Sequence, residues 1–302
     1  MGINCKVTVN PNGIGWQTAA EIEGGGTEGD PNGAPVLAGF RDEVFLFTYE
    51  GWKKSVSVQK GKVNGAEVSF TPVQGSAQPL GRGLAATVFD NTLWSFFVTV
   101  TDDEVRSKHL AFSRYLPELN RFEQGAEFHV TYASSLGQPC AVAYDGELWV
   151  FYHDTALADV RYVTWDGTGA PEKPSNWKRH SLESVKTYQP VSAAVFLDRL
   201  YLAYMDGSSG AIELTCYKAG DWSRPMTVFS YVSEGPSLAV ARGVLYVIAR
   251  SGQDFLQCRA FDGNAFGPVV EVNSADSLVY GSVRSTPYPV DGALVAAYRG
   301  SA

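Results

Sequence analysis

The chain has 302 residues, of which 19% are charged, 13% are aromatic and 31 are glycine. This composition excludes a disordered chain and a coiled coil, because both are poor in aromatic residues and rich in charged ones. The net charge of −8 disfavours nucleic acid and anionic membranes as partners, since both attract a surplus of Lys and Arg. Because no apolar run approaches the ~20 residues that span a bilayer, we expect a soluble globular protein without membrane insertion.

One pattern recurs along the whole chain: a strand of small apolar residues, a tight polar turn, and a strand of aromatic and aliphatic residues. Its copies cover residues 36–47, 85–96, 141–151, 192–203, 238–248 and, more weakly, 289–298. The residues that open the second strands of these copies lie about 50 positions apart, the spacing of a propeller blade. Alternating apolar residues bounded by Asp, Asn and Gly predict a β-hairpin in every copy.

The remainder of each copy predicts two further strands. In the fourth copy, residues 212–217 form a third strand, and Trp222 precedes a fourth strand at 226–229. No segment of ten or more residues shows a clean helical period, so we expect few helices. The repeat predicts an all-β, six-bladed β-propeller with four antiparallel strands per blade.

The two ends of the chain complement each other. The sixth copy stops after two strands, and the N-terminus begins with the missing half, at residues 5–9 and 19–22. N-terminal strands that join the last hairpin would close the ring and leave no open sheet edge. We therefore expect one domain, 1–302, with blades at about 34–82, 83–138, 139–189, 190–234, 235–281, and 282–302 plus 1–33.

Most aromatic residues repeat by position, which favours packing between blades over ligand binding. The clearest set occupies the same place in the second strands of successive copies: Phe45, Trp94, Trp149, Tyr201 and Tyr246. Trp52 differs, because it lies in a polar loop and matches no other copy. It is therefore a candidate for contact with a ligand or partner.

The four cysteines lie in apolar strand-like runs, which favours buried free thiols over disulfides. With no CxxC pair and four scattered histidines, we expect no metal site and no cofactor. Free cysteines and an N-terminus unlike a signal peptide predict a reducing, cytoplasmic location, with non-classical export as an alternative. The sequence also carries no G-x-S-x-G, H-E-x-x-H or phosphate-binding glycine motif.

The repeat resembles that of the six-bladed fungal and bacterial fucose lectins, whose blades carry Gly-x-Ile-Arg-Glu-x-x-Tyr-Asp-Gly and a Trp before the last strand. The nearest segment is 159–167, with Arg161 at the Arg position and Trp165-Asp166-Gly167 near its end. Tyr162, Leu214 and Cys258 occupy the place of the Glu in three copies. The resemblance implies the propeller fold and a glycan-binding role, in which the Arg contacts sugar hydroxyls and an aromatic ring covers the apolar sugar face.

We expect a carbohydrate-binding protein without catalytic activity, whose partner is a glycan or another small polar ligand. The residues expected to bind it are Arg161, Tyr152, His153, Asp154, Trp165, Trp177 and, in a separate loop, Trp52. Two alternatives remain: an enzyme with one central pocket, glycosidase-like or pericyclase-like, and a protein-binding module of a toxin or secretion assembly. A homo-oligomer is compatible with each of them.

Overall fold

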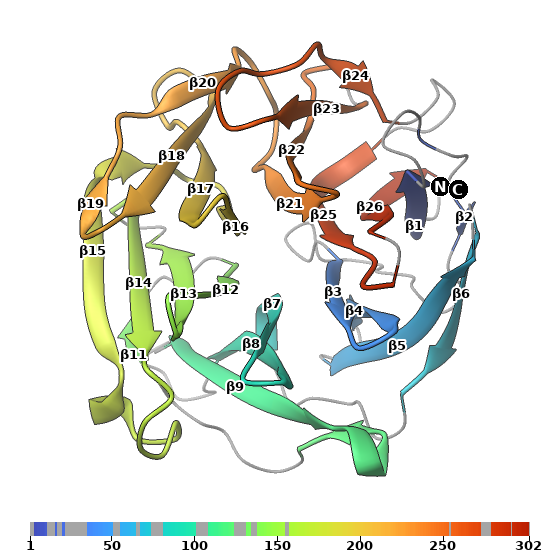
Figure 1. The fold of residues 1–302 in the computed structure, drawn as a ribbon, viewed down its shortest axis with the longest axis vertical. Coiled ribbons are helices and arrows are strands. Elements are labelled where there is room, and N and C mark those ends of the chain that lie inside the picture. The colour runs from blue at the N-terminus through green and yellow to red at the C-terminus, as the bar shows by residue number, and fades with distance from the viewer. Residues whose placement is uncertain are drawn as a thin grey trace.

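The computed structural model describes residues 3–10, 16, 20–21, 35–50, 55–64, 67–73, 81–100, 108–123, 131–133, 138–154, 157–253, 255–272, 279–290 and 292–301. Over these residues the chain forms six antiparallel sheets that stand in a ring around a central axis (Figure 1). The predicted all-β, six-bladed propeller is therefore confirmed.

Each sheet is one blade, and the first strand of each blade lies nearest the axis (Figure 1). Blade I consists of β3 (Val36–Phe40), β4 (Glu43–Glu50), β5 (Ser55–Asn64) and β6 (Glu67–Pro72). Blade II consists of β7 (Gly81–Phe89), β8 (Thr92–Val100), β9 (Lys108–Leu116), β10 (Arg121–Phe122) and β11 (Thr131–Ala133). Blade III consists of β12 (Cys140–Tyr144), β13 (Glu147–His153), β14 (Asp159–Trp165) and β15 (Lys178–Lys186). In blade II, β10 and β11 both pair with β9, so two short strands take the place of one outer strand.

Blades IV to VI follow the same plan, and the last of them combines strands from both ends of the chain. Blade IV consists of β16 (Ser192–Phe196), β17 (Arg199–Met205), β18 (Ile212–Lys218), β19 (Asp221–Trp222) and β20 (Met226–Phe229). Blade V consists of β21 (Ser237–Ala241), β22 (Val244–Arg250), β23 (Leu256–Phe261) and β24 (Val270–Glu271). Blade VI consists of β25 (Val279–Pro287), β26 (Leu294–Ser301), β1 (Ile3–Asn10) and β2 (Ala20–Glu21). Two single-turn 3-10 helices, η1 (Pro117–Leu119) and η2 (Pro174–Asn176), lie in connections between strands.

The predicted closure of the ring is confirmed by the pairing of the two ends. β1 runs antiparallel to β26 from Ile3 opposite Ser301 to Asn10 opposite Leu294, and β2 pairs with the outer side of β1. The C-terminal hairpin thus supplies the two inner strands of blade VI, and the N-terminal segment supplies the two outer ones.

The sixth copy is shifted from the sequence assignment. Pro289 and Val290 do not form its first strand but lie in the turn that follows β25, where the Tyr288 N–H donates to the Ala293 carbonyl. Proline has no N–H to donate to a strand ladder, which accounts for its place beyond the strand end. Strands β7 and β25 also begin at Gly81 and Val279, ahead of the blade boundaries expected at 83 and 282.

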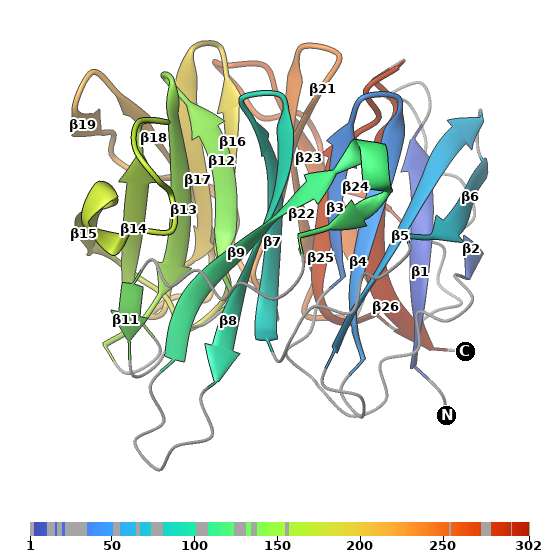
Figure 2. The same cartoon turned by 90° about the horizontal axis from the view of Figure 1, so that it is seen from below.

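The turns between first and second strands explain the recurring Asp, Asn and Gly residues. Asp145 and Gly146 have φ of 51° and 75°, and Asp90 and Asn91 have φ of 46° and 51°. Positive φ at both central residues is typical of the type I′ turn, whose twist matches that of the strands it joins. These turns lie along the upper edge of the ring in Figure 2, opposite the N- and C-terminal ends.

The hydrophobic core lies between blades, and the predicted aromatic ring is part of it. Phe45, Trp94, Trp149 and Tyr201 are buried, and each packs in a cluster that combines its own blade with the next one. Tyr246 is partly buried at the junction of blades V and VI. The positional repeat therefore reports blade-to-blade packing.

In the part of the chain that the structure describes, no helix is long and apolar enough to cross a membrane. The described residues also include no group of three or more His, Cys, Asp or Glu placed to hold a metal ion. Cys140, Cys216 and Cys258 are free cysteines, as predicted. The Cys5 side chain lies outside the part of the chain that the structure describes.

Candidate functional site

Arg161 and Asp154, two of the residues selected from the sequence, lie together at the junction of blades II and III. Arg161 is on β14, and Asp154 follows β13 in the loop that joins these strands. The Arg161 Nη2 and Asp154 Oδ2 atoms are 3.6 Å apart, with side-chain exposures of 35% and 9%. A largely buried carboxylate therefore lies beside a guanidinium that still reaches solvent.

The loop between β13 and β14 fixes the position of Asp154. The Asp154 N–H donates to the Asp159 carbonyl at 2.8 Å, and the Leu157 N–H donates to Asp154 Oδ1 at 3.4 Å. Asp159 itself pairs with Lys186 rather than with Arg161. Asp166, which follows β14, accepts hydrogen bonds from Thr168, and these hold the pKa of its carboxyl below the usual value.

Tyr152 and His153 lie on opposite faces of β13. Tyr152 is opposite Arg161 in the strand register, and it is buried in the cluster between blades II and III. His153 is opposite Val160, whose cluster belongs to the junction of blades III and IV. Since neighbouring residues of a strand point to opposite faces, Tyr152 lies on the side of Arg161 and His153 does not.

Trp165 and Trp177 are buried members of the core between blades II and III rather than part of an open pocket. Their ring centroids are 5.9 Å apart, and their indole N–H groups donate to the Thr168 and Pro171 carbonyls. Trp165 lies on the same strand as Arg161 but four residues further on, about 13 Å away at the rise of a β-strand. Trp52 lies outside the described residues.

A second arginine, Arg114 of blade II, was not selected from the sequence. Its Nε and Nη2 atoms donate to the Glu123 carboxylate at 2.9 and 2.7 Å, and its guanidinium lies 5.5 Å from the Trp94 ring centroid. Such a bidentate pair uses both carboxylate oxygens. Arg114 is thus engaged within its own blade more fully than Arg161.

The first strands of the blades leave a channel along the axis. Its wider part, at the end with the hairpin turns, offers about 320 Å³ to water-sized molecules, and its narrower part offers about 70 Å³. Every described residue that lines either part has an uncharged side chain, and most of these side chains are small.

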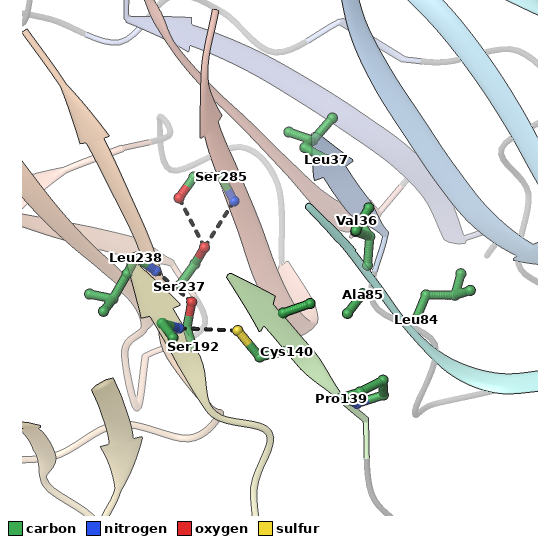
Figure 3. Close-up of a pocket in the computed structure, with 13 residues that line it drawn as sticks. Val36, Leu37, Leu84, Ala85, Pro139, Cys140, Ser192, Ser237, Leu238 and Ser285 are labelled. Atoms are coloured by element: carbon green, nitrogen blue, oxygen red, sulfur yellow. Dashed lines mark hydrogen bonds between the residues drawn. The ribbon is translucent and has the colours of Figure 1, made fainter. Parts of the chain in front are cut away.

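The narrow part of the channel is held by side chains that link one blade to the next (Figure 3). Cys140 Sγ accepts a hydrogen bond from the Ala193 N–H at 3.1 Å, and Ser192 Oγ accepts one from the Leu238 N–H at 2.9 Å. Ser237 Oγ accepts in the same way from the Ser285 N–H at 2.9 Å. Each acceptor is the first residue of an inner strand, and its donor lies in the inner strand of the following blade.

No protein-family model and no curated protein matches the sequence. Among solved structures, an Aleuria aurantia lectin mutant in complex with Fucα1-6GlcNAc is similar, with 15% identity, 86% of each chain covered and a TM-score of 0.62. The lectin SapL1 in complex with α-methyl fucoside has 12% identity over 90% of this chain and 97% of its own, with a TM-score of 0.61. AofleA from Arthrobotrys oligospora has 12% identity over 90% of this chain and 80% of its own, with a TM-score of 0.58.

At these identities the comparisons show the fold. The chain shares the six-bladed propeller of these proteins over most of its length. Fold alone does not carry a function, which has to be argued from the site itself.

Proposed function

We propose that the protein is a carbohydrate-binding, lectin-like propeller, and that Arg161 heads a binding site at the junction of blades II and III. The observation that carries the proposal is a solvent-reaching guanidinium beside a carboxylate that is only 9% exposed. A guanidinium presents five N–H donors in a fixed fork, a geometry suited to neighbouring hydroxyl oxygens of a sugar.

Asp154 has an orienting role in this proposal. The 3.6 Å separation of the two charged groups is longer than a hydrogen bond, so the carboxylate attracts the guanidinium without occupying its donors. Tyr152 supports the site from the buried side, because it lies opposite Arg161 in the strand register and is buried. Trp52, in a separate loop, remains a proposed second contact, and Trp165 and Trp177 support the junction from its buried core.

A glycan array with the purified protein tests the proposal, followed by calorimetric titration of each sugar that binds. We expect Arg161→Ala to lower the affinity at least about tenfold, the equivalent of 1.4 kcal/mol, and Arg161→Lys to restore only part of it, because lysine lacks the fork. Lys178→Ala is the matched control, since Lys178 forms an exposed ion pair with Glu147 on the same blade.

Three results would contradict the proposal. A protein that binds no sugar on the array is not a lectin, and release of free sugar from an array glycan would favour the propeller enzyme. Unchanged affinity in a folded Arg161→Ala protein would move the site away from this junction, and Trp52→Ala would then be measured next.

The remaining partner and location assignments are also proposals. The net charge of −8 supports a partner other than nucleic acid. Three free cysteines in the described chain support a reducing, cytoplasmic environment. A homo-oligomer would multiply any weak sugar site, and light scattering measures its presence.

A further inference from the structure

Two tyrosines stand out on the face of the ring opposite the hairpin turns. Tyr188 and Tyr231 are 63% and 68% exposed, the highest exposures of any aromatic side chains that the structure describes. Tyr188 lies in the connection from β15 to β16, and Tyr231 in the connection from β20 to β21. They therefore occupy two successive junctions, III/IV and IV/V.

Each tyrosine ring lies on a glycine of the following blade. A Cβ atom at Gly252 would be 2.4 Å from Tyr231 Cε1, and one at Gly207 would be 3.2 Å from Tyr188 Cε2. Both glycines are the second residue after a second strand, β22 or β17. The same contact thus recurs at the same place in two blades, and a side chain at position 252 would have to displace the Tyr231 ring.

Backbone hydrogen bonds hold both connections in place. Beside Tyr188, the Gly207 N–H donates to the Lys186 carbonyl at 2.9 Å, and the Thr187 N–H donates to the Ala158 carbonyl at 2.8 Å. The connection that carries Tyr231 is held in the same manner: the Val232 N–H donates to Gly210 at 3.1 Å and the Ser233 N–H to Arg250 at 3.2 Å. The backbone that carries each ring is therefore preorganised, which lowers the entropy lost on binding.

The neighbours of these rings in the chain are polar. Asp206, which precedes Gly207, accepts hydrogen bonds from the backbone and hydroxyl groups of Ser208 and Ser209. Near Tyr231, Glu234 Oε1 lies 3.5 Å from Arg250 Nη1. A flat ring bordered by hydrogen-bonding groups suits a sugar, which has an apolar C–H face and polar edges.

We propose that Tyr188 and Tyr231 are two stacking platforms for pyranose rings, so that blades III to V bind a branched or extended glycan at successive junctions. The inference rests on the proposed carbohydrate binding, and it adds two sites to the one headed by Arg161. Sites one blade apart on a rigid ring raise the effective concentration of a second sugar once the first is bound.

The test uses a printed array of mono- and oligosaccharides together with methyl α-L-fucoside in solution. We expect the Tyr188→Ala/Tyr231→Ala double variant to lose at least about tenfold of the array affinity for branched or extended glycans. The variants Tyr188→Phe and Tyr231→Phe keep the ring face, so their array affinities should stay within about threefold of that of the original protein. Leu197→Ala is the control, because Leu197 is 59% exposed in a hairpin turn on the opposite face.

Gly252→Ala separates the placement of the ring from its chemistry. The added Cβ must displace the Tyr231 ring, so this variant should lose affinity as Tyr231→Ala does. Gly267→Ala is its control, because the nearest atom to a Cβ there is 3.6 Å away. Melting curves show which variants are folded.

The outcomes distinguish this inference from the proposed function. If Arg161→Ala lowers binding while the folded double tyrosine variant and Gly252→Ala do not, the platforms are wrong and the lectin proposal stands. An array on which the original protein binds nothing overturns both. Loss of binding in Leu197→Ala equal to that of the double variant would also overturn the platforms.

Discussion

The inner strands of the ring are joined in two different ways. From blade III to blade VI, the first inner residues Cys140, Ser192 and Ser237 each accept a hydrogen bond from the backbone of the next blade. In blades I and II, Val36 and Ala85 occupy the equivalent positions, as their strand partners Phe47 and Phe96 show. At this position blades III to V have polar links, and blades I and II have apolar side chains.

The comparison indicates which contacts keep the inner strands in register in each of these two groups of blades. Between blades I and II, Phe40, Phe45 and Tyr115 pack edge to face, with the Phe45 and Tyr115 centroids 4.9 Å apart, and Phe122 packs tilted against Tyr115. Aromatic packing is strong but tolerates sliding, whereas a hydrogen bond to a specific N–H fixes one position. Blades III to V, which carry the proposed sugar sites, have both kinds of contact.

The largest effect is expected where the ring is closed. Deletion of residues 1–22 removes β1 and β2, exposes the edge of β26 and uncovers the cluster that contains Val7 and Val9. We expect the truncated protein to aggregate and to lose its cooperative unfolding, as seen by size-exclusion chromatography and calorimetry. A monomer with an unchanged melting curve would show that closure contributes little.

The polar links can be broken one at a time. Ser192→Ala leaves the buried Leu238 N–H without its acceptor, which we expect to lower the free energy of unfolding by about 1–3 kcal/mol. Ser192→Cys should lower the free energy of unfolding less than Ser192→Ala does, because Cys140 Sγ already accepts the equivalent hydrogen bond one blade earlier. Urea denaturation measures both, and equal losses in the two variants would argue that volume rather than the hydrogen bond is responsible.

The smallest effect concerns pH and blade III. Burial lowers the pKa of the His180 imidazole, with Glu147 opposing the shift and Lys178 adding to it. A pKa lowered by folding means that the folded state resists protonation, so stability is kept above the usual pKa of 6.5 and falls as the pH drops through the folded value. His180→Phe, which keeps a ring stacked on Tyr162, should flatten the difference between urea midpoints at pH 8 and pH 5.5.

The fold could be predicted from the sequence because the repeat is long and its turns are chemically specific. Asp145-Gly146 and Asp90-Asn91 indicate hairpins by themselves, and the split repeat indicates closure. The weak sixth copy was misassigned because prolines at the strand end obscured the alternation of β25. Local residue types therefore determine most of the blades.

The candidate site was only partly predictable, because burial in a propeller is decided by the neighbouring blade. Arg161 and Asp154 come from one hairpin and were expected together, and they are together. The residues around Trp165 in the sequence do not indicate whether blade II covers its side chain. Tyr188 and Tyr231 were missed because they lie in connections, where only the glycine one blade further along the chain distinguishes them from ordinary loop residues.

The pairing of β1 with β26 also affects how the chain folds during synthesis. Ile3 is the partner of Ser301, so β1 must wait for β26 before it acquires a hydrogen-bonded inner neighbour. Contacts between residues so far apart in the sequence are slow to form, because the intervening loop has to close first. Until the ribosome has released the C-terminal hairpin, Val7 and Val9 lack the inner strands that cover them, and this is the period in which a chaperone would be of most use to the nascent chain.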